Sequence, residues 1–191
     1  MIEQDFSNLT GKILIASPYT MEGNVFHKSM IYVIQHNKEG SVGLIINHPI
    51  NHSPASSLFK KIDAGIDFKD LDLDVHLGGP VEMERGFFLH TNEYNKNLLF
   101  NPINDGLAVS SNLQIIQDIS NGVGPKQSLF IIGYTGWGAD QLEFELENNL
   151  WIISEPELDL IFDEGSVNKW HKALSALGIS KHDFIPEIAI C

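Results

Sequence analysis

Residues 128–146 constrain the fold more than any other part of the chain. They open with an unbroken apolar run, Leu129–Ile132, whose residue types favour strands, and such a run is typical of a strand buried on both faces. Three glycines follow within residues 133–138, which indicates a tight turn with positive φ at one or more of them. Trp137 lies between two of these glycines, so we expect an indole ring carried on a loop with little to shield it, where it either covers a small core or anchors a partner.

A helix is predicted after the glycines. Leu142, Leu146 and Leu150 follow helical spacing, although Leu142 and Leu146 also fit the alternation of a strand together with Phe144. We favour the helix because Asp140, near its start, suits the positive end of the helix dipole. A strand, a glycine-rich turn and a helix often present a binding site, so residues 133–143 are the expected centre of a functional site.

Elsewhere, short strands and separate helices are predicted without regular alternation. Strands are expected at residues 12–16, 30–35, 42–46, 75–77, 86–90, 107–109 and 150–153, and helices at residues 54–62, 113–119, 156–162 and 166–177. The polar residues 36–41 join the strands on either side of them as a hairpin. This order favours an α+β fold with a mixed, mainly antiparallel sheet. The chain has 191 residues, 43% of them apolar, and no internal repeat or low-complexity linker, so we expect one domain over residues 1–191.

The acidic balance of the chain bears on its partners. The formal net charge is −13, and such a surface repels the phosphate backbone that supplies most non-specific nucleic-acid affinity, so direct nucleic-acid binding is not expected. Between Lys126 and Lys169 the chain carries only acidic charges. This segment is either a solvated face that keeps the protein soluble or a docking surface for a basic partner. The expected partner is a protein or a small molecule, and the oligomeric state stays open.

Cysteine use and the lack of targeting signals predict a cytoplasmic protein. Cys191 is the only cysteine, so no disulfide can form within the chain, which fits a reducing compartment. Residues 1–6 lack the basic and apolar regions of a signal peptide. No apolar run approaches the roughly 20 residues that span a bilayer, so no membrane contact is expected.

Most reaction motifs are absent from the sequence. Neither a glycine-rich nucleotide loop, nor a G-x-S-x-G nucleophile turn, nor a metal-ligand pattern occurs, so no cofactor and no metal are predicted and catalysis is not favoured. His36, in the predicted hairpin turn, either binds a ligand or hydrogen-bonds its own turn. Arg85, the only arginine, follows the turn at residues 78–80, where it either anchors a ligand carboxylate or pairs with an acidic residue of the chain.

Several motifs in this order resemble those of the AlgH/YqgE family of bacterial proteins. They are Gly11-x-x-Leu-Ile-Ala-Ser-Pro18, His36-x-x-x-Gly40-x-x-Gly-Leu-Ile-Ile-Asn47-x-Pro49, Gly78-Gly-Pro-Val81 and Gly133-Tyr-x-Gly-Trp-Gly-x-x-Gln-Leu-Glu143. The resemblance extends over residues 9–178. It implies a compact α+β fold with a barrel-like sheet and flanking helices, and it implies no established catalytic residues. One branch is spoken of as a regulator of alginate production, which implies a transcriptional role.

Two positions depart from the pattern of the family. His48 replaces an arginine that is common between the asparagine and the proline of the second motif, and residues 23–24 are Gly-Asn where Asp-Pro is more usual. An anion-binding role of that arginine therefore does not transfer to this chain.

These observations favour a non-catalytic binding or regulatory protein whose contact surface centres on residues 133–143. The candidate binding surface consists of His36, Asn47, Gly78, Gly79, Arg85, Gly136, Trp137, Gly138, Gln141 and Glu143. One alternative is an enzyme with an unfamiliar site, in which His36, Arg85 and Glu143 converge in a cleft. A second alternative, implied by the resemblance, is a transcriptional regulator.

Overall fold

The computed structural model describes residues 6, 8–18, 23–50, 75–96, 98–104, 106–112, 114–162 and 165–179. Its strands are β1 (Ile13–Ala16), β2 (Met30–Asn37), β3 (Gly40–Ile45), β4 (Val75–Leu77), β5 (Val81–Thr91), β6 (Leu98–Asn104), β7 (Leu107–Ser110), β8 (Ser128–Gly138) and β9 (Trp151–Ser154). Its helices are α2 (Gln114–Ser120), α3 (Gln141–Glu147), α4 (Leu158–Phe162) and α5 (Ser166–Ala176). The helix predicted at residues 54–62 lies outside the described residues.

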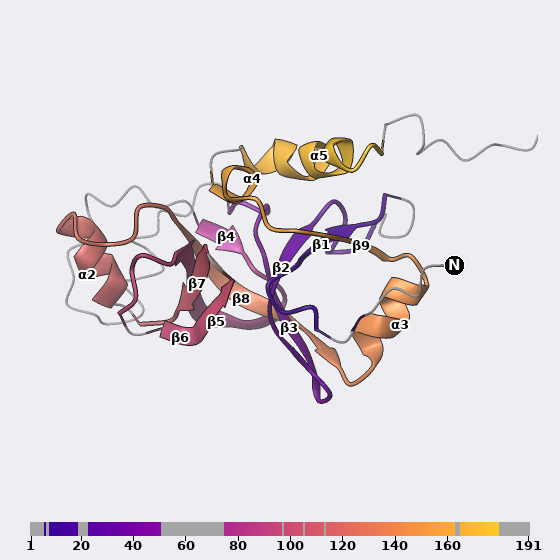
Figure 1. The fold of residues 1–191 in the computed structure, drawn as a ribbon, viewed down its shortest axis with the longest axis horizontal. Coiled ribbons are helices and arrows are strands. Elements are labelled where there is room, and N and C mark those ends of the chain that lie inside the picture. The colour runs from indigo at the N-terminus through magenta and orange to yellow at the C-terminus, as the bar shows by residue number, and fades with distance from the viewer. Residues whose placement is uncertain are drawn as a thin grey trace, which may run out of the picture.

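The strands form one mainly antiparallel sheet in the order β6-β7-β5-β8-β3-β2-β1-β9, and β4 is added parallel to β8 (Figure 1). Strand β8 joins the two halves of this sheet. Its first part, residues 128–134, pairs with β5, and residues 130–132 also pair with β4. Its last part, residues 135–138, pairs with β3. The apolar run and the glycines of residues 128–138 therefore form the central strand, which pairs with β3, β4 and β5.

The sheet is open, so the barrel-like closure implied by the family resemblance is overstated. In the strand order, β6 and β9 lie at opposite ends, where each pairs with a single neighbour. Strand β6 was not predicted, because its sequence contains Pro102 and two asparagines, which weaken a strand signal. A proline is tolerated on an edge strand, where one side of the backbone makes no ladder bonds. The prediction of an α+β fold with a mainly antiparallel sheet is confirmed.

At β1 both faces of the sheet are buried, since successive residues of a strand point to opposite sides and all four residues of β1 are buried. In β1, Ile13 and Ile15 belong to one apolar cluster, whereas Leu14 and Ala16 belong to another. This explains why β1 is apolar at every position instead of alternating.

Different helices cover the apolar clusters (Figure 1). Helices α4 and α5 pack on the face of Ile13 and Ile15, where the indole of Trp170 also donates a hydrogen bond to the carbonyl of Ala16 at 2.9 Å. Helix α3 covers the opposite face. Helix α2 packs on a third cluster around Phe88 at the far end of the sheet. Among the described residues, no helix has the length and apolar character needed to cross a membrane.

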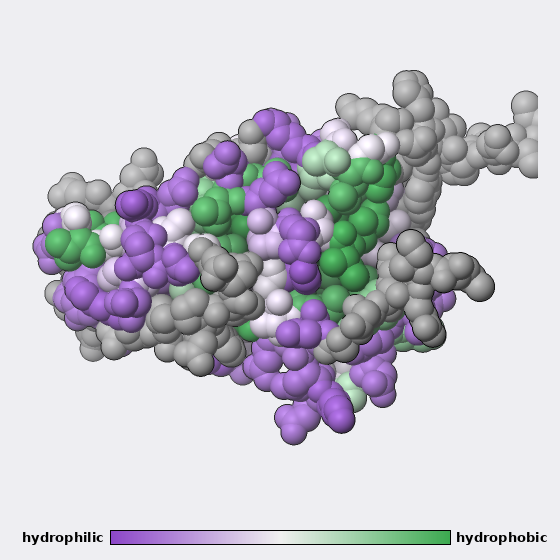
Figure 2. All heavy atoms as spheres, viewed as in Figure 1, coloured by the Kyte–Doolittle hydropathy of each residue, from purple (hydrophilic) through white to green (hydrophobic). Residues whose placement is uncertain are grey.

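The surface is largely hydrophilic around α2 and the β2–β3 hairpin (Figure 2). A hydrophobic strip crosses the region in which Figure 1 places β1 and β9. In β9, Trp151 is buried, whereas Ile152 and Ile153 are half-buried. The start of β9 therefore belongs to the core, and the rest of the strand lies close to solvent.

Candidate functional site

The glycine-rich residues 133–138 continue strand β8 and do not form the predicted turn. Residues 135–138 pair in antiparallel register with residues 40–43 of β3. Gly133 has a positive φ of 70°, as predicted for at least one glycine, but the chain stays extended after it. The prediction was wrong because glycine accepts many conformations, and here the pairing with β3 selects the extended one.

Trp137 is buried, which corrects the expectation of an exposed ring. Only 6% of the residue is accessible, because the alternation of β8 directs Trp137 and Thr135 toward the interior. The ring packs over Gly43 of β3, where an added Cβ would lie 3.2 Å from the ring and would clash with Ile31. Glycine at position 43 therefore makes room for the indole.

The two indole groups of Trp137 and Trp151 share one carboxylate oxygen. The Nε1–H of Trp137 donates to Oε2 of Glu145 at 2.8 Å, and the Nε1–H of Trp151 donates to the same oxygen at 2.6 Å. Gln141, one helical turn before Glu145, donates from Nε2 to the other oxygen at 2.9 Å. The rings meet edge to face with their centroids 6.0 Å apart. Helix α3 is thus tied by Glu145 to both β8 and β9.

A pocket of about 200 Å³ opens beside this carboxylate. Its walls come from β8, from α3, from the start of β9 and from residues 24–26. The lining consists of Asn24, Phe26, Thr135, Gly136, Trp137, Gln141, Glu145, Leu150 and Trp151. Phe26 meets Trp151 edge to face, with the centroids 5.9 Å apart. The pocket therefore combines three aromatic rings with one carboxylate.

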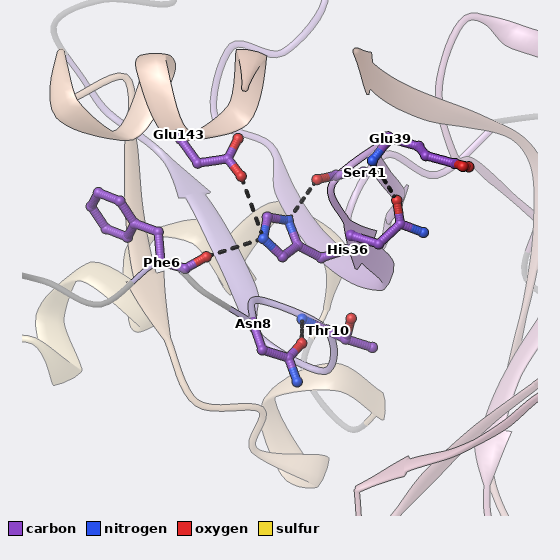
Figure 3. A network of polar contacts seen from close by, with 8 residues as sticks. Phe6, Asn8, Thr10, His36, Glu39, Ser41 and Glu143 are labelled. Carbon is purple, nitrogen blue, oxygen red and sulfur yellow. Dashed lines mark hydrogen bonds and ion pairs between the residues drawn. The ribbon is translucent and has the colours of Figure 1, made fainter. Parts of the chain in front are cut away.

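His36 lies in a second network of polar contacts, in which Glu143 of α3 points toward its ring (Figure 3). Its Nε2 faces two acceptors, the carbonyl of Phe6 at 3.0 Å and Oε1 of Glu143 at 3.4 Å, so Nε2 carries the proton. In the neutral ring, Nδ1 then accepts a hydrogen bond from the hydroxyl of Ser41 at 2.8 Å. Ser41 is buried, and the side chain of His36 is 4% exposed although the residue as a whole is half-buried. The network joins the hairpin, the residues before β1 and α3.

Of the three residues in the enzyme hypothesis, the structure brings His36 and Glu143 together but not Arg85. The guanidinium of Arg85 donates to Glu82 at 3.2 Å and lies over the ring of Phe87 at 5.1 Å. Within the described part of the chain, no contact joins it to His36 or Glu143. The internal pairing considered for Arg85 is therefore the one observed.

Other candidate residues have contacts within the fold. Asn47 accepts a hydrogen bond from the backbone amide of Met30 at 2.7 Å and donates one to the carbonyl of Lys28 at 2.8 Å. Gly78 and Gly79 lie where the β4–β5 connection passes close to the backbone of β8, which leaves no space for a Cβ at either position. Gly138 donates its amide to Oε1 of Gln141 at 3.0 Å.

Glu145 and Trp151 complete the pocket and were not among the residues predicted from the sequence. Their signal was present but weak. Gln141 and Glu145 are four apart on the predicted helix, so they share a face. Trp151 begins a predicted strand, and nothing local connects it with Trp137. No group of three potential metal ligands occurs among the residues that the structure describes.

Comparison with known proteins identifies the family. The sequence profile of the AlgH-like family (DUF179) matches residues 13–182. This chain belongs to the AlgH-like family. The UPF0301 protein RP032 of Rickettsia prowazekii (strain Madrid E) is 49% identical over 188 residues, which are 98% of either chain. The UPF0301 protein RT0098 of Rickettsia typhi (strain ATCC VR-144 / Wilmington) is 48% identical with the same coverage.

Solved structures of similar proteins agree with this membership. The solution structure of the AlgH protein from Pseudomonas aeruginosa, PA0405, matches with a TM-score of 0.75 and 31% identity over 94% of both chains. The crystal structure of protein DIP2367 from Corynebacterium diphtheriae matches with a TM-score of 0.70 over 92% of this chain and 90% of that one, and at 17% identity it shows the fold alone. The resemblance to AlgH read from the motifs is confirmed. None of these names states an activity, so the chemistry of AlgH-like proteins has to be argued from the site.

Proposed function

We propose that this AlgH-like protein is a cytoplasmic, non-catalytic binding and regulatory protein whose ligand enters the pocket beside Glu145. The observation that carries the proposal is the lining of this pocket. Ligand sites are typically concave and largely aromatic or apolar, with a few polar groups that set the orientation of the ligand. Three rings and the carboxylate of Glu145 supply this combination. The pocket also includes residues 135–137 and Gln141 of the most specific motif in the sequence.

The size of the pocket limits the kind of ligand. About 200 Å³ is below the roughly 300–1,000 Å³ of sites that enclose a whole drug-sized molecule. The pocket therefore accommodates one group of a larger ligand, such as a protein side chain or the end of a small molecule. A protein or small-molecule partner suits the net charge of −13 better than a nucleic acid does.

Two phenylalanines provide a matched test. Phe26 forms one wall of the pocket, whereas Phe144 lies on the outer face of α3 with 63% of its surface exposed. A thermal-shift screen of a metabolite library against the wild type identifies ligands, because a ligand that binds only the folded state raises the melting temperature. We expect Phe26→Ala to abolish the shift and Phe144→Ala to retain it. If the rise in melting temperature is lost only in Phe144→Ala, the ligand binds to the outer face of α3 and not in the pocket.

A catalytic function is the second candidate, and one observation favours it. Ser41, His36 and Glu143 are connected by contacts of the kind that activate a nucleophile. However, Ser41 is only 3% exposed, so a substrate reaches its hydroxyl only if the hairpin and α3 separate. Turnover of a metabolite by the purified protein, lost in His36→Ala and in Ser41→Ala, would establish catalysis and refute the binding proposal.

A further inference from the structure

The charge of the pocket points to the class of its ligand. Among the described residues that line it, Glu145 is the one acidic or basic side chain. The remaining lining is aromatic, aliphatic, glycine or neutral polar. A pocket with a single carboxylate and no basic group disfavours an anionic ligand and favours a cationic one.

The hydrogen bonds of the carboxylate leave it able to accept a further donor. A carboxylate has about four lone-pair positions, and Trp137, Trp151 and Gln141 supply three donors. Because both indole N–H groups donate to an anion, the two rings are polarised toward greater electron density. Electron-rich indole rings are the strongest aromatic partners of organic cations.

The chain around the pocket is negatively charged, like the pocket itself. Helix α3 carries Glu143, Glu145 and Glu147, and the sequence has no lysine or arginine from residue 127 to residue 168. Negative potential over this part of the chain raises the local concentration of cations near the entrance of the pocket.

We propose that the pocket binds the ammonium group of an organic cation, carried either by a small molecule or by a lysine side chain. The inference rests on the proposed function, because it names the ligand class of the same pocket. The ammonium group lies against the indole rings of Trp137 and Trp151 and is paired with the carboxylate of Glu145. The small volume of the pocket suits such a head group with its adjoining carbon atoms.

Pairs of ligands that differ only in charge test this proposal. Choline is compared with 3,3-dimethylbutanol, its neutral isostere, and Nα-acetyl-lysine methylamide with the norleucine analogue. The readout is the indole N–H signals in ¹H–¹⁵N NMR spectra. The chain has three tryptophans, and Trp170, whose indole binds the carbonyl of Ala16, serves as an internal reference. We expect the signals of Trp137 and Trp151 to shift, with at least roughly tenfold tighter binding of the charged member of a pair.

The two charged ligands distinguish the source of the ammonium group. Tighter binding of choline indicates a small molecule, and tighter binding of the lysine derivative indicates a side chain. Equal binding of charged and neutral members would overturn the cation proposal but leave a ligand pocket in place. If no ligand of either pair binds, the cation proposal also fails, while the phenylalanine test still decides the proposed function.

A substitution that removes the charge but keeps the shape of the side chain gives a second test. Glu145→Gln retains the oxygen that accepts the two indole hydrogen bonds and loses the acceptor of the exposed bond from Gln141. We expect it to weaken binding of the charged ligands roughly tenfold while leaving the neutral ones unchanged. Glu147→Gln removes an exposed charge from the same helix outside the pocket, so it is expected to change binding less than about threefold. Equal effects of the two substitutions would indicate general charge attraction and overturn the assigned role of Glu145. Unchanged binding of the neutral ligands also shows that Glu145→Gln is folded.

Discussion

Replacing Asn47 by alanine separates a structural role of this motif residue from a binding role. Asn47 is 6% exposed and follows β3. Its side-chain oxygen accepts the amide of Met30, and its side-chain nitrogen donates to the carbonyl of Lys28. Alanine can make neither bond, so both backbone groups at the start of β2 lose their partner.

The burial of the two backbone groups sets the magnitude. Met30 is completely buried, so its unpaired amide is not rescued by water, which costs about 1–3 kcal/mol. Lys28 is exposed, so water replaces the second bond at a cost of about 0.5–1 kcal/mol. The free energy of unfolding should therefore fall by about 1.5–4 kcal/mol. For a chain of 191 residues, each kcal/mol corresponds to roughly 2–4 °C in melting temperature.

Urea unfolding followed by circular dichroism measures this loss. The control is Asn8→Ala, which removes one exposed hydrogen bond to the amide of Thr10 and should change the free energy of unfolding by less than about 0.5 kcal/mol. If Asn47→Ala is as stable as this control, the reasoning from its hydrogen bonds is wrong. Loss of ligand binding at unchanged stability would then identify Asn47 as a binding residue.

Three further perturbations test other parts of the structure. Gly43→Ala should lower the free energy of unfolding by about 1–3 kcal/mol and change tryptophan fluorescence, because the new methyl group clashes with Ile31 and presses on the ring of Trp137; a urea titration unchanged from wild type would contradict this. Arg85→Ala should cost less than about 1 kcal/mol, because its ion pair with Glu82 is about half exposed, and a larger loss in the same titration would show that the contact is underestimated. Burial lowers the pKa of His90 below its usual value of 6.5, so the unfolded chain binds more protons there and stability is lost as the pH falls below that value. Urea midpoints measured from about pH 7.5 to about pH 5.5 should therefore decrease, and less steeply in His90→Gln; an identical slope would exclude His90 as the cause.

The helices and strands that could be predicted are those whose formation is indicated by residues close to one another in the sequence. Helix α3 was predicted from the spacing of Leu142 and Leu146, and both residues are buried against the sheet as that spacing requires. The hairpin of β2 and β3 was predicted from two apolar runs around a polar turn, and both strands extend further into residues 36–41 than predicted, with Asn37 paired with Gly40. Strand β6 was not predicted because it contains a proline, which argues against a central strand. The sequence does not show that β6 lies at the edge of the sheet, where a proline is tolerated.

The pocket differs from the site predicted at residues 133–143. Four residues of this stretch, Thr135, Gly136, Trp137 and Gln141, line the pocket, but the ring expected to be exposed is buried, and the carboxylate beside it is Glu145 and not Glu143. The two glutamates are two positions apart on α3, so helical spacing directs them to different faces of the helix. Glu143 contacts His36 of β2, whereas Glu145 contacts Trp137 of β8.

The sequence by itself determined most of the strands and helices, many apolar positions of the core and the membership of the AlgH-like family, because periodicity and motif order depend only on neighbours along the chain. Tertiary structure alone decided whether the glycines of residues 133–138 turn or continue the strand. Glycine permits either path, and the bonds to β3, which come from residues about ninety positions earlier, select one of them. The same pairing buries Trp137 and brings it to Trp151 and Glu145, so the pocket exists only in the folded chain.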